Sequence, residues 1–139
     1  MNSSRRQGRE AALQTIYLVD ICRLDVKDIP SAVWSEEPLS LKTREFAEHL
    51  ANGVVTHREK IDQLVSHYAK NWEMKRMAAI DRSILRLATC EILVDLETPI
   101  NVIINEAVEI AKKYSTAESS KFVNGILDKI KQERNNNGK

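Results

Sequence analysis

The sequence predicts an all-α protein, and three observations favour this fold class. Only 4 Gly and 3 Pro occur among 139 residues, and aromatic residues make up 5% of the chain. So few turn residues do not fit a β-sandwich or β-barrel, which needs a turn after each short strand. Hydrophobic residues make up 42% of the chain, are mostly Leu, Ile, Val and Ala, and recur at the spacing of buried helix faces. We therefore expect residues 1–139 to form a single helical domain.

Composition also excludes some classes of protein. No apolar run approaches the roughly 20 residues of a membrane-spanning helix, and the N-terminus has no apolar signal segment, so we expect a cytoplasmic protein. Cys22 and Cys90 lie far apart in apolar helical settings, which favours buried free thiols over a zinc or redox site. Because 21 Lys+Arg nearly cancel 20 Asp+Glu, local charge patterns are more informative than the net charge of +1.

The first helix is expected from Ser4 to about Cys22, because Ser4 and Gln7 fit a capping box. Its apolar face, at i, i+3, i+4 spacing, holds Leu13, Ile16 and Tyr17. The helical pattern then fails over residues 23–40, which contain two interrupting prolines and are expected to form a connector.

Residues 41–68 keep a helical period that is too long for one ordinary helix. Gly53 and the capping-box pattern from Thr56 to Glu59 predict a break near residues 54–57, and therefore two helices.

A further helix is expected over about residues 77–96. Glu91 falls on its apolar face, and a buried carboxylate is costly unless it has a partner. We predict that Glu91 is ion-paired or hydrogen-bonded.

Two helices are expected to close the chain. Thr98 as cap and Pro99 as first helical residue form a strong start signal, followed by a clean apolar stripe. The stripe consists of Ile100, Ile103, Ile104, Ala107, Val108 and Ala111. A capping box from Ser115 to Glu118 starts the last helix, which runs to about Ile130 and leaves a frayed polar tail over 133–139. These patterns predict five to seven helices in antiparallel hairpins.

Catalytic motifs are missing from the sequence. It has no glycine-rich phosphate loop, no His-Glu-x-x-His and no Gly-x-Ser-x-Gly. His49, His57 and His67 are not spaced as helical metal ligands, and the pair Glu45 and His49 is common on solvated helices. We therefore expect no catalytic site, no metal and no cofactor.

Arginines at the start of the first helix are the most informative charges. A helix N-terminus is partially positive, so Arg5, Arg6 and Arg9 each cost a few tenths of a kcal/mol there. Phosphate groups would meet both their guanidinium groups and the unpaired helix amides, which predicts RNA contact. The alternative is a solvated charge cluster on a flexible terminus.

A second basic and aromatic group surrounds residues 115–120. It consists of Lys112, Lys113, Tyr114, Lys121 and Phe122. Single-stranded RNA binds through backbone charge and base stacking, which this group can provide, although Phe122 could instead belong to the core. Gly125 costs about 1 kcal/mol relative to Ala inside the last helix, which predicts close approach of another helix or backbone.

Four segments carry a family resemblance. They are Arg5–Glu10 with Tyr17, Asp81–Ala88 with Glu91, Pro99 with Ile104–Lys112, and Ser120–Asp128. In this order and spacing they resemble the NusB family of transcription antitermination factors over nearly the whole chain. The resemblance implies about seven helices in two small three-helix bundles.

The resemblance also implies a non-catalytic adaptor that binds boxA-type RNA together with NusE, a small-subunit ribosomal protein. In that family the complex joins RNA polymerase with other Nus factors and suppresses premature termination on ribosomal RNA operons. Some members form homodimers. The family fold is also appended to ribosomal RNA methyltransferases, but we expect no room for a methyl-donor-binding domain in 139 residues.

Site residues follow from the resemblance one by one. It implies RNA contacts from Arg5, Arg6, Arg9, Glu118 and Phe122, and we add Lys113 and Lys121 from charge alone. Gln7 stands where the family often has another basic residue, so a weaker phosphate contact is expected.

Two residues are expected to face NusE, namely Tyr17 and Asp81. From the residues alone, Tyr17 could instead lie at the edge of the core and Asp81 in a surface ion pair. Asn105 and Glu106 are expected to be structural. Two alternatives stay open, a protein-interaction scaffold with incidental arginines and an enzyme subunit.

Overall fold

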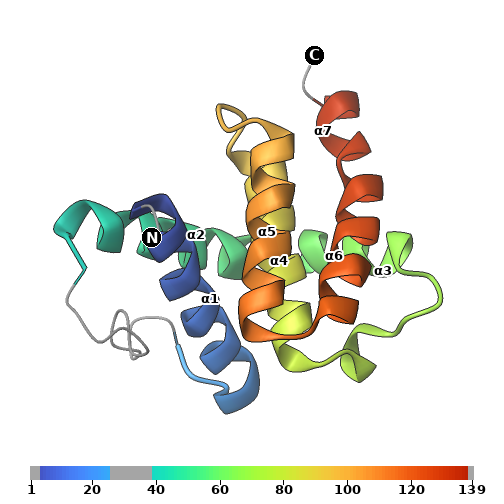
Figure 1. The fold of residues 1–139 in the computed structure, drawn as a ribbon, viewed down its shortest axis with the longest axis horizontal. Helices are drawn as coiled ribbons and strands as arrows, with labels where there is room; N and C mark the ends of the chain where they lie inside the picture. The colour runs from blue at the N-terminus through green and yellow to red at the C-terminus, as the bar shows by residue number, and fades with distance from the viewer. Residues whose placement is uncertain (1–3, 26–38, 138–139) are drawn as a thin grey trace.

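The computed structural model describes residues 4–25 and 39–137, and Figure 1 shows that this part of the chain is entirely helical, as predicted. The elements are α1 (Ser4–Cys22), α2 (Leu41–Thr56), α3 (Arg58–Tyr68), the 3-10 helix η2 (Met74–Arg76), α4 (Ala79–Val94), α5 (Ile100–Tyr114), α6 (Ala117–Ile130) and α7 (Gln132–Asn137). Among these residues no helix combines the length and apolar character needed to span a membrane.

Helix α4 is the centre of the fold. It packs against α1 and α2 on one side and against α3, α5 and α6 on the other, so two groups of helices share it (Figure 1). Its buried residues cover most of its circumference, including Ile84, Leu85 and Ile92. A helix that is buried nearly all round must be enclosed by its neighbours, which explains why α4 holds both groups together.

The helix boundaries agree well with the periodicity of the sequence, but three capping predictions are wrong. The N-cap of α6 is Thr116 in place of the expected Ser115. Thr56 is the last residue of α2, and the N-cap position of α3 is His57, which makes no side-chain capping hydrogen bond. A single residue therefore separates the two helices, and its amide donates to the Gly53 carbonyl at 3.0 Å. Helix α5 has Pro99 at its N-cap position in place of Thr98.

Other helix starts are capped by hydroxyl groups. The Ser40 hydroxyl accepts a hydrogen bond from the amide of Thr43 at 3.2 Å, and Thr116 accepts one from the amide of Ser119 at 2.9 Å. Each bond satisfies one of the amides that a helix start leaves unpaired. Helix α1 begins at Ser4 itself, so its capping position, like residues 26–38 of the expected connector and both prolines there, lies outside the described residues.

Glycines mark the closest approaches between helices. A Cβ on Gly8 would lie 2.5 Å from the Phe46 ring, so only glycine lets α1 sit this close to α2. Gly125 behaves differently, because a Cβ there would meet no atom within 4 Å. The prediction of a close helix contact at Gly125 is therefore wrong.

The prediction for the cysteines is half right, because Cys90 is buried and Cys22 is exposed.

Arg134 is anchored, although it lies in the tail that was expected to fray from residue 133 onward. Helix α7 continues to Asn137, and Arg134 donates hydrogen bonds to four backbone carbonyl groups at the end of α4 and just after it. The acceptors are Glu91, Ile92, Asp95 and Thr98, at 2.6 to 3.0 Å. The guanidinium group thus ties α7 to the end of α4, and its bonds to Glu91 and Asp95 add to the hydrogen bonds that these carbonyls already accept from backbone amides.

Candidate nucleic acid interface

The arginines of α1 lie in three different environments. Arg5 is exposed, and its guanidinium carbon lies 4.1 Å from the centre of the Phe46 ring, a cation–π contact with α2. Arg6 is partly exposed and donates to both carboxylate oxygens of Glu106 in α5, one of them at 2.6 Å. That hydrogen bond lowers the pKa of Glu106 and raises the pKa of Arg6.

Arg9, which was expected to contact RNA, is buried in this structure. Its side chain is 5% exposed and forms an ion pair with Glu91, whose side chain is 2% exposed. Burial raises the pKa of Glu91, and the hydrogen bonds from Arg9 oppose that shift. The predicted partner of Glu91 is therefore confirmed, while the guanidinium group of Arg9 is occupied inside the protein.

Helix α5 is tied to α1 by a further polar cluster. Glu10 accepts hydrogen bonds from the Lys113 ammonium at 3.0 Å and from the Tyr114 hydroxyl at 2.9 Å. The hydrogen bond from Lys113 to Glu10 raises the pKa of Lys113, and burial raises the pKa of Tyr114. Lys113, assigned to RNA from its charge alone, thus has a structural partner as well. Glu106 is structural, as predicted; Asn105 is exposed.

A hollow of about 540 Å³, here called the α4/α6 hollow, lies where the starts of α4 and α6 meet. Its walls include Asp81, Glu118, Lys121 and Phe122, which the sequence assigned to two different partners. It also includes Trp72, Arg76 and Ser119, which sequence reasoning did not assign. The fold therefore brings all four predicted site residues of α4 and α6 into one site.

Aromatic side chains form one side of this hollow. Phe122 is half-buried and packs against the core, which supports its interpretation as a core residue, and its contact with RNA stays a prediction. The Trp72 ring meets Phe122 edge to face at 5.3 Å and is 58% exposed. An exposed Trp next to a basic stretch was a usable signal in the sequence, because such rings stack on bases.

Asp81 lines the hollow and is only 8% exposed, so it is not the surface ion pair considered above. One carboxylate oxygen accepts a hydrogen bond from the Ser119 hydroxyl at 2.8 Å. The other oxygen is buried and has no hydrogen-bond partner in the described part of the chain. A buried acceptor without a partner is unfavourable, so this oxygen is suited to a donor from a bound molecule.

Tyr17 is half-buried on α1, near a second junction with α4. One turn further along α1, Asp20 forms ion pairs with Arg82 at 2.7 Å and Arg86 at 3.3 Å. Burial alone would raise the pKa of Asp20, but the bonds and charges of these arginines outweigh it and lower the pKa. The Asp20 pairs fix the second half of α1 against the first half of α4, where Asp81 precedes Arg82.

Among the described residues, no cluster of three or more His, Cys, Asp and Glu is placed to hold a metal ion. The exposed guanidinium group of Arg5, the exposed ring of Trp72 and the unpartnered carboxylate oxygen of Asp81 are suited to binding.

The family model described as NusB family matches residues 6–132. The transcription antitermination protein NusB of Elusimicrobium minutum is 44% identical over 135 residues, which cover 96% of each chain. Among solved structures, NusB of T. maritima has a TM-score of 0.85 and 39% identity, covering 96% of this chain and 94% of that one. A chain from a structure of antitermination factors NusB and NusE in complex with dsRNA has a TM-score of 0.77, covers 96% of this chain and 99% of that one, and at 24% identity is similar in fold alone.

Proposed function

The chain belongs to the NusB family, and we propose that this transcription antitermination protein is an adaptor that binds boxA-type single-stranded RNA together with the ribosomal protein NusE. The observation that carries the proposal is the α4/α6 hollow, where two aromatic rings, two cationic side chains and an unpartnered carboxylate oxygen meet. We further propose that the complex joins RNA polymerase and other Nus factors in the cytoplasm and acts on ribosomal RNA operons.

The RNA part of the proposal rests on two groups of residues. Arg5 presents an exposed guanidinium group at the start of α1, where helix amides also attract phosphate. Lys121 supplies charge at the α4/α6 hollow, and Phe122 and Trp72 supply ring faces and edges for bases. Glu118 is exposed and can accept hydrogen bonds from the amino groups of bases.

Arg6 is less available for RNA binding than Arg5. Its side chain is 23% exposed and already paired with Glu106. Phosphate would have to compete with that carboxylate, so we assign Arg6 a secondary contact. Arg9, buried against Glu91, positions α1 and does not reach phosphate in this conformation.

The protein partner is proposed to use Asp81 and Tyr17. The unpartnered oxygen of Asp81 would accept a hydrogen bond from a donor on NusE, and Tyr17 offers a half-buried aromatic surface on α1. Because Asp81 and Phe122 line one hollow, protein and RNA would meet there. Binding of one should therefore strengthen binding of the other.

The test is a titration of labelled boxA-type RNA and a scrambled RNA, with and without NusE, at two salt concentrations. We expect preference for the boxA-type RNA, tighter binding with NusE, and weaker binding at high salt, because neutralised phosphates release counterions. Equal binding to both RNAs that NusE does not change would contradict the proposal.

One observation favours a second function, a protein-interaction scaffold. Two of the three arginines at the start of α1 are held in ion pairs, as expected if they serve the fold. A scaffold would bind NusE through Asp81 without any effect of RNA. The same titration separates the two functions.

A further inference from the structure

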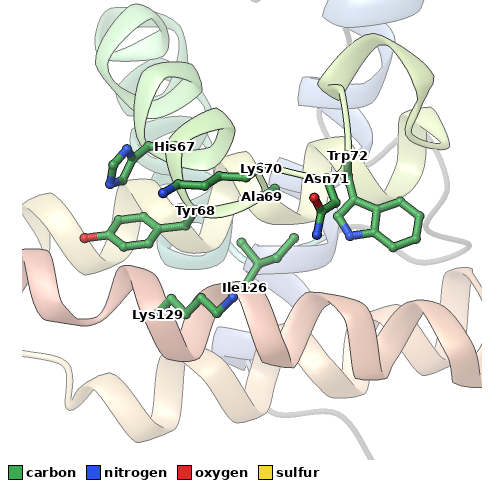
Figure 2. A pocket seen from close by; sticks show the side chains of 8 residues that line it. All are labelled: His67, Tyr68, Ala69, Lys70, Asn71, Trp72, Ile126 and Lys129. Carbon is green, nitrogen blue, oxygen red and sulfur yellow. The ribbon is translucent and has the colours of Figure 1, made fainter.

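A second hollow lies between the end of α3 and the middle of α6, and we call it the α3/α6 hollow. Figure 2 shows Tyr68 and Lys70 facing Ile126 and Lys129 across it, with Asn71 and Trp72 at one end. Its volume is about 290 Å³. Pockets that bind small molecules have volumes from about 300 Å³ upward, so the size of this hollow suits a group of about one nucleotide.

The hollow is basic. Lys70 and Lys129 are exposed, and neither forms an ion pair with any described residue. No carboxylate lines the hollow, although Glu133 lies close by and accepts a hydrogen bond from the Tyr68 hydroxyl at 2.6 Å. Two lysines left without acidic partners on facing elements are suited to one phosphate group.

Trp72 joins this hollow to the α4/α6 hollow, because it lines both. Its ring lies at 75° to the ring of Phe122, so the contact uses an edge and leaves most of the indole surface exposed. Every base has a flat face that can stack on such a ring. A nucleic acid strand leaving Phe122 would therefore meet Trp72 next.

The surface of α6 between the two hollows carries no side chain at one position. Gly125 lies on the same face of α6 as Phe122 and Lys129, three residues after the first and four before the second. It is exposed, and no atom of the described chain lies within 4 Å of where its Cβ would be. The packing of the fold therefore does not require glycine there, whereas a strand lying against the helix backbone would.

We propose that the α3/α6 hollow binds a nucleotide of single-stranded RNA that flanks the segment bound at the α4/α6 hollow. The base stacks on Trp72, the Asn71 amide bonds to its edge, and the phosphate lies between Lys70 and Lys129. Lys121 and Lys129 are about 12 Å apart along α6, and a stacked strand rises about 3.4 Å along its axis per nucleotide, so the path holds more than one nucleotide. This inference rests on the proposed RNA binding and extends its path.

The experiment compares a minimal boxA-type RNA with the same RNA lengthened by four unpaired nucleotides at either end. Fluorescence anisotropy with the full chain and NusE gives both affinities. We expect an extension at one end to tighten binding at least about fivefold, because stacking a single base contributes that much. The double change Lys70→Ala with Lys129→Ala should remove this gain and leave the affinity for the minimal RNA within about twofold. Trp72→Ala should also remove the gain, and because Trp72 lines both hollows it should weaken binding of the minimal RNA as well.

Two controls make the result specific. The double change Lys42→Ala with Lys60→Ala removes the same charge from exposed positions of α2 and α3 outside both hollows and should keep the gain. An extension without bases should keep the part of the gain that depends on the lysines and lose the part that depends on Trp72.

The outcomes separate this inference from the proposed function. Failure of the minimal RNA to bind would overturn the proposed function. Normal binding of the minimal RNA, with no gain from either extension or with a gain that survives both hollow variants, would overturn the α3/α6 hollow alone.

Discussion

Arg9 of α1 and Glu91 of α4 form a buried ion pair in which the guanidinium group donates three hydrogen bonds to the carboxylate, at 2.9 to 3.1 Å. This pair joins the first helix to the central helix. Arg6 repeats the arrangement one turn earlier, on Glu106 of α5. The basic start of α1 is thus held in place by two acids, and only Arg5 is left to present its charge to solvent.

Removing Arg9 should destabilise the fold. Arg9→Ala leaves Glu91 buried without its partner, which typically costs about 3–5 kcal/mol. Urea unfolding followed by circular dichroism measures the change. The double change Arg9→Met with Glu91→Leu should recover most of the loss, since it removes both charges. A single variant as stable as the wild type would show that the pair contributes nothing to folding.

Acid should weaken the contact between α1 and α5. The hydrogen bond from Arg6 lowers the pKa of Glu106 from its ordinary 4.5, so the folded protein favours the carboxylate. The stabilisation is fully present above the ordinary pKa and is lost as the pH falls through the lowered pKa of the folded state.

The variant Glu106→Gln therefore starts less stable at neutral pH and should lose less stability than the wild type between about pH 5 and pH 3. Urea unfolding at a series of pH values gives both curves. Glu109→Gln, at an exposed position of α5, is the control and should follow the wild type. Parallel curves for Glu106→Gln and the wild type would contradict the assignment.

Helices were predictable because periodicity is local. Helix α1 has the predicted bounds, and the break between α2 and α3 falls where Gly53 and Thr56 indicated. The details at the break were not predictable, because a Thr-x-x-Glu pattern fits both a helix start and the end of the preceding helix. The anchoring of Arg134 was also missed, since its acceptors are backbone carbonyls that no side-chain pattern reports.

The other differences between the sequence predictions and the structure come from contacts between helices that are distant in the sequence. The burial of Glu91 was predicted from its face of the helix, but its partner lies 82 positions away and periodicity does not tell which helices meet. Arg9 was therefore assigned to the surface with its neighbours. Trp72 was not assigned to a site for the same reason. It belongs to the α4/α6 hollow because it lies beside Phe122, which follows 50 residues later in the chain (122 − 72).

Arg5 should carry most of the RNA contact at the start of α1. Arg5→Ala should weaken boxA-type RNA binding and reduce the salt slope by about 0.7, the value for one phosphate of a single strand. Arg6→Ala should have a smaller effect on RNA and a larger one on stability. Lys42→Ala, an exposed charge on α2, is the control. An unchanged slope for Arg5→Ala would exclude the phosphate contact.

Asp81 should matter to the protein partner through its charge. Asp81→Asn keeps the size of the side chain and replaces a carboxylate oxygen, so the donor on NusE loses a charged acceptor. A hydrogen bond to a charged group contributes about 1.5–3 kcal/mol, which corresponds to a loss of affinity of about tenfold or more.

Isothermal titration with NusE measures this loss, and thermal unfolding shows whether the fold is kept. Ser119→Ala is the matched control, because it removes the internal hydrogen bond to Asp81 and leaves the unpartnered oxygen in place. NusE binding that survives Asp81→Asn would exclude this residue from the contact.

Gly125 should separate stability from binding. It is exposed inside α6 with no atom near its missing side chain, so Gly125→Ala should stabilise the protein by about 1 kcal/mol through helix propensity. The added methyl group would stand between Phe122 and Lys129, so RNA binding should weaken although the fold becomes more stable. Urea unfolding and RNA anisotropy on the same samples measure both effects.

The control is Asn124→Ala, a change at the neighbouring exposed position on another face of α6, which should leave RNA affinity unchanged. A stabilised Gly125→Ala variant with normal RNA binding would show that no strand lies against this part of the helix.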